Sequence, residues 1–381
     1  MARRIVQISD LHIGAKPDRP PSPYQTKGFV RGTKELFRHG LKDTNSNFFH
    51  SSSHDSEAWN SFVQGWWLEP AARGDVDALI VTGDIARTGS TDDLQIASEM
   101  VYGPAESIAV GFSIDNGLSN NLRVTLNIAG EIPGNAKVVL IPGNHDRYTN
   151  STGLQLNQKF HEYFDQYAIN RLPEAFWLKE IANQRKVVVV AFDSCLESGA
   201  WAMASEAIGD WYSRGCVTNQ IAPLTRLTSE LRRQGCVVIW ATHHTPHPSL
   251  NSAPKFELDG QRLLLAAAKE HSIPLVLGGH HHTESLFIDP SAPHQGVYSA
   301  PTLAESGSDH KGFTVWSIDA PEGTDEVVID AERYRYQGRG AYQFRSEHSP
   351  DRGTRERDVF RKTAGLPLKA TVPRVVGGIP Y

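Results

Sequence analysis

The sequence predicts an α/β fold, because apolar strand-like runs alternate with helical segments and a polar motif follows each run. Five such runs occur in order: RIVQIS, DALIVT, AKVVLIP, CVVIWAT and PLVLGG. Each is followed by Asp, Asn or His. In α/β sheets, ligands bind beyond the carboxyl ends of the strands. We therefore expect the five strand ends to meet at one crevice.

The first half of the chain contains two well-marked helix starts. Ser56 is expected to cap a helix whose apolar face packs on the core, with Trp59, Phe62, Val63 and Trp66 at helical spacing. After the strand DALIVT, the next helix is expected to begin at Ser90 as N-cap, with Asp93 in the position of the capping acid. The region from Gly103 to Asn135 is expected to mix helix and loop.

The second half continues the alternation and then turns to strands. A helix is predicted over 154–168, followed by the buried strand KVVVVAFDS. The segment 218–235 predicts an amphipathic helix in which Leu224, Leu227 and Leu231 share a face and Gly235 fits the C-terminal stop. GQRLLLAAAKEHSIP predicts a further helix that ends by Pro274. GVYSAP, GFTVWSID and EVVIDAERYRYQ then predict strands in an antiparallel part of the sheet system.

The organisation is expected to be one large domain over 1–345, followed by a polar C-terminal tail over 346–381 that is solvated or docks a partner. An insertion over 15–55 is rich in Pro, Ser and Asn and predicts mostly loop, with a short helix over 33–39. Long loops in compact domains often act as binding elements or lids, although a solvated excursion without a role fits this composition equally well.

Composition narrows the class of protein. The chain has 381 residues with 39% hydrophobic residues, which suffices for a sizeable core, and its net charge of −5 argues against wholesale attraction to nucleic acid or anionic membrane. Three cysteines imply no disulfide framework and suit a reducing compartment. Neither a secretory signal nor a membrane-spanning stretch is evident, so the expected location is cytoplasmic, without membrane attachment.

The residues at the strand ends have the chemistry of metal ligands. Asp10 and His12 are two residues apart, as are His280 and His282, and this offset points side chains the same way from an extended backbone. The Asp84 carboxylate has enough lone pairs to bridge two metals. The remaining donors are the Asn144 amide oxygen and the His243 imidazole, and imidazoles are common ligands of Zn, Fe, Mn and Ni.

The ordered motifs DLH, GD, GNHD, THH and GHHH resemble those of the calcineurin-like metallophosphoesterase superfamily, over roughly residues 4–335. Each motif alone is weak, but five in the right order, each after a strand, are specific. The resemblance implies a two-sheet mixed β-sandwich flanked by helices, in four layers from helix to helix. The sequence pattern by itself supports only an α/β fold with ligands at strand ends.

The resemblance also implies roles for the site residues. Two metal ions, Mn, Fe or Zn, would be held by these groups: Asp10, His12 and His282 at the first, Asn144, His243 and His280 at the second, and Asp84 as the bridge. His145 would be a catalytic histidine whose ring Asp146 orients. His244 is expected to support the ligands rather than bind metal. Arg147 is expected either to contact a phosphate oxygen or to pair with a surface carboxylate.

The implied activity is hydrolysis of a phosphoric ester by attack of a metal-bound hydroxide on phosphorus. VTGDIARTGSTDDLQIASEM and RGCVTNQIAPLTRL look like the cyclic-nucleotide and glycerophosphodiester phosphodiesterase branch, which favours a small or nucleotide-like phosphodiester. The insertion over 15–55 is longer than that branch leads us to expect, which counts against cyclic nucleotides.

Three alternatives remain open on the sequence. A nuclease would need a basic groove, to which Lys27, Arg31, Lys34 and Arg38 would contribute. A phosphomonoesterase, including a protein phosphatase, would use the same metals. A non-catalytic binding protein would be marked by the loss of a ligand, and the five motifs retain them all.

Overall fold

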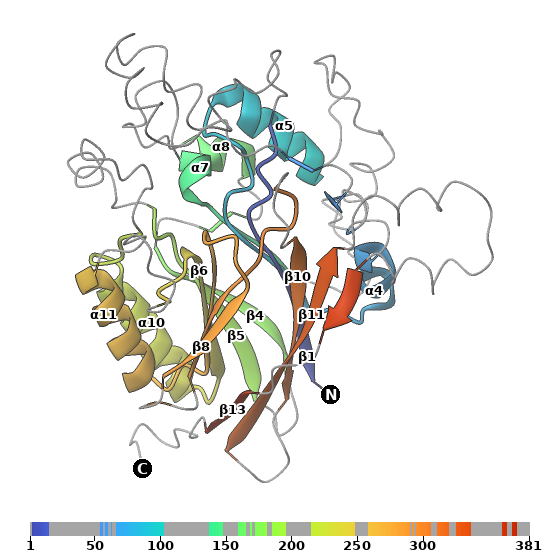
Figure 1. Cartoon of the computed structure of the whole chain (residues 1–381). Helices are drawn as coiled ribbons and strands as arrows, with labels where there is room; N and C mark the ends of the chain where they lie inside the picture. The colour runs from blue at the N-terminus through green and yellow to red at the C-terminus, as the bar shows by residue number, and fades with distance from the viewer. Residues whose placement is uncertain are drawn as a thin grey trace.

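The computed structural model shows two β-sheets with helices packed around them (Figure 1). The described residues are 2–14, 54–55, 58–59, 62, 66–102, 137–147, 159–164, 168–169, 172–180, 185–195, 215–247, 258–289, 292, 295–305, 311–319, 325–336, 360–363 and 368–371. The predicted helix over 33–39, almost all of the insertion over 15–55, and the whole region from 103 to 135 lie outside them.

The first sheet has the strand order β12-β11-β10-β1-β2-β3, with β13 also paired to β11. Its strands are β1 (Arg3–Ile8), β2 (Ala78–Thr82), β3 (Lys137–Ile141), β10 (Gly312–Asp319), β11 (Glu326–Tyr336), β12 (Phe360–Thr363) and β13 (Leu368–Thr371). β1, β2 and β3 run parallel, whereas β10 and β11 add antiparallel strands on the other side of β1. The carboxyl ends of β1, β2 and β3 therefore lie at one edge of the sheet.

The second sheet has the order β4-β5-β6-β7-β9-β8. Its strands are β4 (Glu174–Glu180), β5 (Lys186–Ala191), β6 (Val237–His244), β7 (Leu275–Gly279), β8 (Ser285–Ile288) and β9 (Gly296–Ser299). The four central strands β5, β6, β7 and β9 run parallel, and both edge strands are antiparallel to their neighbours.

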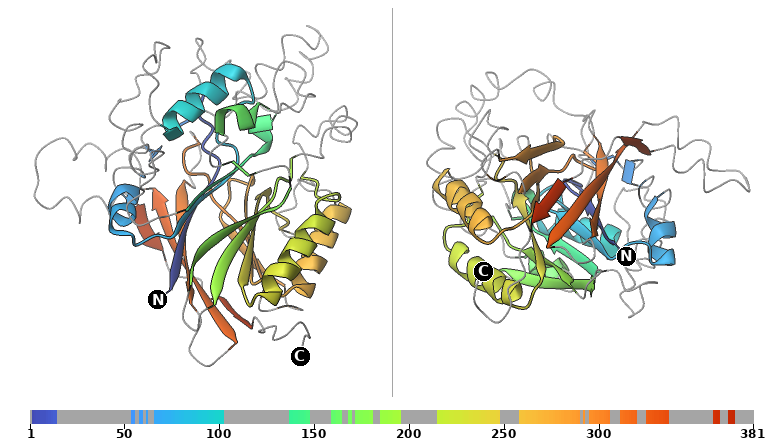
Figure 2. Two further views of the ribbon diagram at one scale, coloured as in Figure 1. Left: turned by 180° about the vertical axis from the view of Figure 1, so that it is seen from behind. Right: turned by 90° about the horizontal axis from the view of Figure 1, so that it is seen from below.

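Helices cover the outer faces of the two sheets and the edge at which the parallel strands end. They are α4 (Leu68–Arg73), α5 (Thr91–Tyr102), α7 (Asn144–Arg147), α8 (Phe160–Phe164), α10 (Ile221–Arg233) and α11 (Leu258–Glu270). α10 and α11 lie side by side against the second sheet, while α5, α7 and α8 gather beyond the carboxyl ends of the first sheet's parallel strands (Figures 1 and 2). This is the predicted α/β sandwich, and the expected layered fold is confirmed.

The alternation of side chains along each strand explains why the sheets are covered on both faces. In β2, Leu79 belongs to the outer hydrophobic cluster and Ile80 to the cluster between the sheets. In β6, Ile239 faces the other sheet while Trp240 packs beneath α10 and α11. Successive side chains of a strand point to opposite faces, so a continuous apolar run requires a cover on each side.

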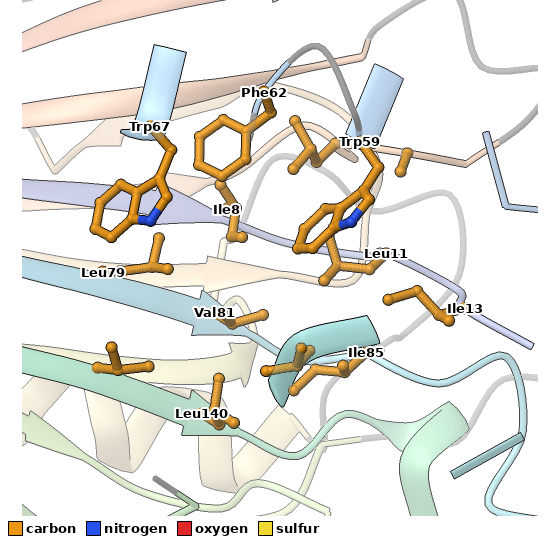
Figure 3. Packing of buried hydrophobic residues seen from close by; sticks show 14 of the residues in the cluster. Ile8, Leu11, Ile13, Trp59, Phe62, Trp67, Leu79, Val81, Ile85 and Leu140 are labelled. Atoms are coloured by element: carbon orange, nitrogen blue, oxygen red, sulfur yellow. The ribbon is translucent and has the colours of Figure 1, made fainter. Parts of the chain in front are cut away.

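The outer face of the first sheet is covered by the predicted aromatic stripe. Trp59, Phe62 and Trp67 lie over Ile8 and over the side chains of β2 (Figure 3). Trp66 is also buried and contacts Phe313 of β10, with ring centroids 4.7 Å apart. The expectation that the stripe forms core is met at Trp59, Phe62 and Trp66, while Val63 lies outside the described residues.

Several local predictions are confirmed. The Ser90 hydroxyl accepts a hydrogen bond from the backbone N–H of Asp93 at 3.3 Å, as an N-cap does, and α5 begins at the next residue. Leu224 and Leu231 of α10 are buried, and Gly235 has a φ of 77° after the helix end.

Other elements differ from the prediction. Of the helix predicted over 154–168, residues 154–158 and 165–167 lie outside the described residues, α8 is helical, and Ala168 forms a bridge with Leu140. The helix α11 ends at Glu270, because Ser272 takes a left-handed φ of 51° before Pro274. β9 belongs to the second sheet, where it pairs parallel with β7 as well as antiparallel with β8. The polar tail predicted over 346–381 contributes the strands β12 and β13 to the first sheet. No helix among the described residues is long and apolar enough to cross a membrane.

The core between the sheets can be tested by truncation. Ile239 is fully buried there, so Ile239→Ala should lower the free energy of unfolding by about 2–5 kcal/mol. The control Leu263→Ala on α11, whose side chain is 48% exposed, should change it by no more than about 0.5 kcal/mol. Denaturant unfolding monitored by circular dichroism measures both, and equal losses would contradict the assigned layers.

Candidate metal centre

Five strand ends bring the predicted ligands together from both sheets. Asp10 and His12 follow β1, Asp84 follows β2, and Asn144 begins α7 directly after β3. The second sheet supplies the remaining three, which are His243 near the end of β6 and the pair His280 and His282 after β7. All of these side chains except His282 are buried, and His282 is partly exposed. The predicted ligands therefore come together from the strand ends of both sheets.

The first group of donors contains Asp10, His12, Asp84 and His282, each of which offers one ligand atom within 4.8 Å of the others. Nε2 of His282 lies 3.3 Å from Nε2 of His12 and 3.2 Å from Oδ1 of Asp10. Among the described residues, Oδ1 of Asp10 has no hydrogen-bond partner of good geometry although it is buried. Burying such an acceptor is costly unless a cation or donor satisfies it. This group has the arrangement of a cation site.

The second group centres on the Asn144 amide. Its Oδ1 lies 2.9 Å from Nε2 of His243 and 2.9 Å from Nδ1 of His280. Nε2 of His243 is also 3.4 Å from Oδ1 of Asp84. Asp84 therefore borders both groups, which is the position that the sequence predicts for a bridging carboxylate. His244 lies beside this group, with ring centroids 4.4 Å from His280.

The backbone at the centre is strained. Among the described residues, the non-glycine positions with positive φ include five of the predicted ligands. They are Asp10 (55°), His12 (49°), Asp84 (51°), His280 (71°) and His282 (52°). Left-handed backbone is uncommon outside glycine and costs roughly 1–3 kcal/mol where the surroundings enforce it. The turns that leave the strands thus aim the ligands at the expense of local stability.

Gly143 shows how closely these turns approach one another. A Cβ atom built at this position would overlap Oδ1 of Asp84, so only glycine fits between β3 and the Asp84 turn. The same carboxylate oxygen accepts the backbone N–H of His145 at 2.8 Å. The GNHD motif therefore supplies both a ligand and the backbone that holds Asp84 in place.

In the metal-free centre, the buried carboxylates and imidazoles shift one another's pKa values. Burial alone would raise the pKa of Asp84, but His243 and the neighbouring imidazoles hold it well below its usual range. Burial opposes protonation of His243 and His282, yet Asp84 raises the pKa of His243 to about 9 and Asp10 raises that of His282 to about 10. Burial and the nearby His145 lower the pKa of His12 to about 3. Without metal, the protons on His243 and His282 therefore balance the carboxylates of Asp84 and Asp10.

His145 stands next to the ligands without belonging to either group. Its Nδ1 donates to the Arg87 carbonyl at 2.8 Å, and its ring meets His12 edge-on with centroids 4.7 Å apart. Among the described residues, the predicted hydrogen bond from Asp146 to this ring is absent. The buried Asp146 carboxylate accepts backbone N–H groups of Ile85, Ala86 and Gly143 instead. Asp146 therefore joins the GD and GNHD turns, and the Arg87 carbonyl orients His145.

Arg147 pairs with a carboxylate, as one of its two expected roles required, but that carboxylate is buried rather than at the surface. Its buried guanidinium pairs with the buried carboxylate of Asp193, after β5, and lies 3.3 Å from Nε2 of His161. Nδ1 of His244 lies 2.9 Å from the Ser194 hydroxyl, and His244 also offers a ligand atom within 4.8 Å of those of His243 and His280. These contacts tie α7 and β6 to the turn that follows β5.

Sequence reasoning missed the supporting groups Asp193, Ser194, Thr302 and Glu305. Glu305 is the clearest case, because its Oε2 lies 2.5 Å from Nδ1 of His282. It follows β9 within the stretch APTLAES, so a polar group after a strand was again the available signal. The stretch lacks a recognisable motif, and this is why the pattern did not reveal it.

The donor set suits metal ions of the expected kinds. Imidazole nitrogens combined with carboxylate and amide oxygens fit Zn, Fe and Mn, and the shared Asp84 fits two ions better than one. Asp10, His12 and His282 would hold the first ion, and Asn144, His243 and His280 the second.

Comparison with known proteins assigns the family. A family model described as calcineurin-like phosphoesterase matches residues 3–284. This match spans most of the chain, and the protein therefore belongs to the calcineurin-like phosphoesterase family. The resemblance inferred from the five motifs is thereby confirmed, and the family supports a phosphoric ester hydrolase. None of the curated proteins compared with the chain matches it.

Several solved structures are similar to the chain at low sequence identity. A dimetal phosphatase from Danio rerio is 14% identical, and the match covers 86% of this chain and 95% of that one with a TM-score of 0.46. GAP50, described as the anchor in the inner membrane complex of Plasmodium, is 10% identical over 88% and 84% of the two chains, with a TM-score of 0.48. Vps29 from Chaetomium thermophilum is 10% identical over 100% of both, with a TM-score of 0.31.

Metal uptake should release protons in a pH-dependent manner. A protonated imidazole must lose a proton to bind metal. In the metal-free protein the pKa of His243 is about 9 and that of His282 is about 10, so both rings are protonated at pH 8. Loading at pH 8 should therefore release about two protons, and the release should fall towards zero above pH 10. Titration calorimetry in buffers of different ionisation enthalpy counts these protons. A count near zero at pH 8 would contradict the assigned charges.

Proposed function

We propose that the protein is a binuclear metal-dependent hydrolase of phosphoric esters, with a small or nucleotide-like phosphodiester as substrate. The observation that carries this proposal is the pair of donor groups that share Asp84, with His145 directly beside them. Two metal ions bound there would activate a water and neutralise charge on the phosphoryl oxygens. Such a centre fits phosphoryl transfer, in which catalysis is mainly positioning and electrostatics.

His145 is suited to protonate the leaving oxygen. Its Nδ1–H donates to the Arg87 carbonyl, and this bond can persist whether Nε2 carries a proton or not. The ring thus keeps its orientation while Nε2 gives up a proton and regains it. Because the side chain is only partly buried, Nε2 can exchange protons with solvent between turnovers.

The preference for a diester over a monoester is supported by the state of the nearby arginines. A monoester phosphate carries up to two negative charges, and proteins often bind it with a bidentate guanidinium. The buried guanidinium of Arg87 faces Asp93 at 3.4 Å, and that of Arg147 pairs with Asp193. Both cations are thus already balanced by carboxylates. A diester carries a single negative charge, so it needs less positive charge from such a site.

The roles of the two central residues can be separated by mutation. His145→Ala should reduce kcat by about 10²–10⁴-fold while both metals stay bound, because the ring is assigned to proton transfer alone. Asp84→Asn should abolish turnover and also reduce the bound metal, because the bridge loses its charge. Steady-state kinetics and elemental analysis of the same samples measure the two effects. Full activity of His145→Ala would refute its catalytic role.

The substrate class can be tested with a chromogenic phosphodiester and the matching monoester. Metal-stripped protein reloaded with Mn²⁺, Zn²⁺ or Fe²⁺ should hydrolyse the diester with the higher kcat/KM, and Asp84→Asn should be inactive on both. Preference for the monoester would place the protein on the phosphatase side. A nuclease would instead cleave polynucleotides with a steep dependence on salt.

A further inference from the structure

Glu305 lies behind a predicted ligand of the first metal. Nδ1–H of His282 donates to its carboxylate at 2.5 Å, while Nε2 on the opposite side of the ring faces Asp10 and His12. The imidazole therefore stands between Glu305 and the first donor group. The Glu305 side chain is 20% exposed, so solvent only partly screens its charge.

The loop that carries Glu305 is hydrogen-bonded to the turn after β1 that carries Asp10. The backbone N–H of Leu303 donates to the Ser9 carbonyl at 2.9 Å, and the Thr302 hydroxyl donates to the Asp10 carbonyl at 2.7 Å. The same hydroxyl oxygen accepts the backbone N–H of Glu305 at 3.0 Å. The carboxylate is thereby held at a set position relative to both Asp10 and His282, and it need not be ordered when metal binds.

In the second donor group, His243 and Asn144 have neutral groups at the corresponding positions. Nδ1–H of His243 donates to the neutral carbonyl of Thr82 at 2.7 Å, and Asn144 contributes a neutral amide where the first group has the Asp10 carboxylate. A histidine whose outer nitrogen donates to a carboxylate is a more basic metal ligand than one that donates to a carbonyl. The two metal positions thus differ in charge although they share Asp84.

We propose that Glu305 is a positioning residue that makes the first metal position, formed by Asp10, His12 and His282, the tighter of the two. The inference rests on the binuclear centre of the proposed function. Glu305 lies outside the five motifs, and it would set the order in which the two metal positions fill.

The test is Mn²⁺ binding to the metal-stripped full-length protein, measured by titration calorimetry. The wild-type protein should bind two ions with unequal affinity. Glu305→Ala should weaken the tighter ion by about 10–100-fold and leave the weaker one unchanged. Glu305→Gln keeps an acceptor oxygen without the charge, so its affinity for the tighter ion should lie between those of the wild-type protein and Glu305→Ala. Glu332→Ala is the matched control, because its side chain is 25% exposed and lies on β11, where it accepts from Tyr334.

A second variant identifies the position that is weakened. His243→Ala removes a ligand of the second position, so the ion that it still binds should be the tight one, and Glu305→Ala in that background should weaken it by the same factor. Unchanged Mn²⁺ affinities in Glu305→Ala, with its circular dichroism spectrum intact, would overturn the inference. Equal weakening of both ions would also overturn it, since a general loss of structure would then be the cause.

The proposed function can fail separately. If Glu305→Ala weakens one ion as expected but the wild-type protein hydrolyses neither diester nor monoester, the metal assignment stands and the hydrolase proposal falls. If hydrolysis is seen and Glu305→Ala leaves both Mn²⁺ affinities unchanged, only the inference about Glu305 falls.

Discussion

The buried carboxylate of Asp84 is the group on which the rest of the site depends. A charge that is nearly inaccessible to water is costly unless other groups compensate it, and here His243 and the backbone N–H of His145 face it directly. The turn that carries it is left-handed and is packed against Gly143. The groups that contact Asp84 therefore either compensate its charge or position it to bind cations.

The fold meets this requirement by joining two sheets at one edge. The first sheet supplies Asp84 and its neighbours at the ends of β1, β2 and β3, and the second supplies the histidines at the ends of β6 and β7. Neither sheet holds the complete ligand set. The apolar layer between them thus positions the centre as well as stabilising the chain, and the strained ligand turns are carried on rigid strands.

The sequence predicted the parts of the structure that have a local signal. Strand runs and the five motifs located the site, since a polar residue directly after an apolar run is visible in one dimension. The role of Asp146 was wrong, because its carboxylate binds backbone groups of another turn and no pattern encodes that choice. Glu305 and the strands β12 and β13 were missed for a related reason, because their partners lie far away along the chain.

The central claim is that five strand ends form one centre for two metal ions that share Asp84. Anomalous diffraction from crystals of the Mn²⁺-loaded protein tests it most directly. Two peaks roughly 3.5–4 Å apart are expected, with Asp84 between them. One should be bounded by Asp10, His12 and His282 and the other by Asn144, His243 and His280. A single peak, or two peaks of which one lies away from Asp84, would contradict it.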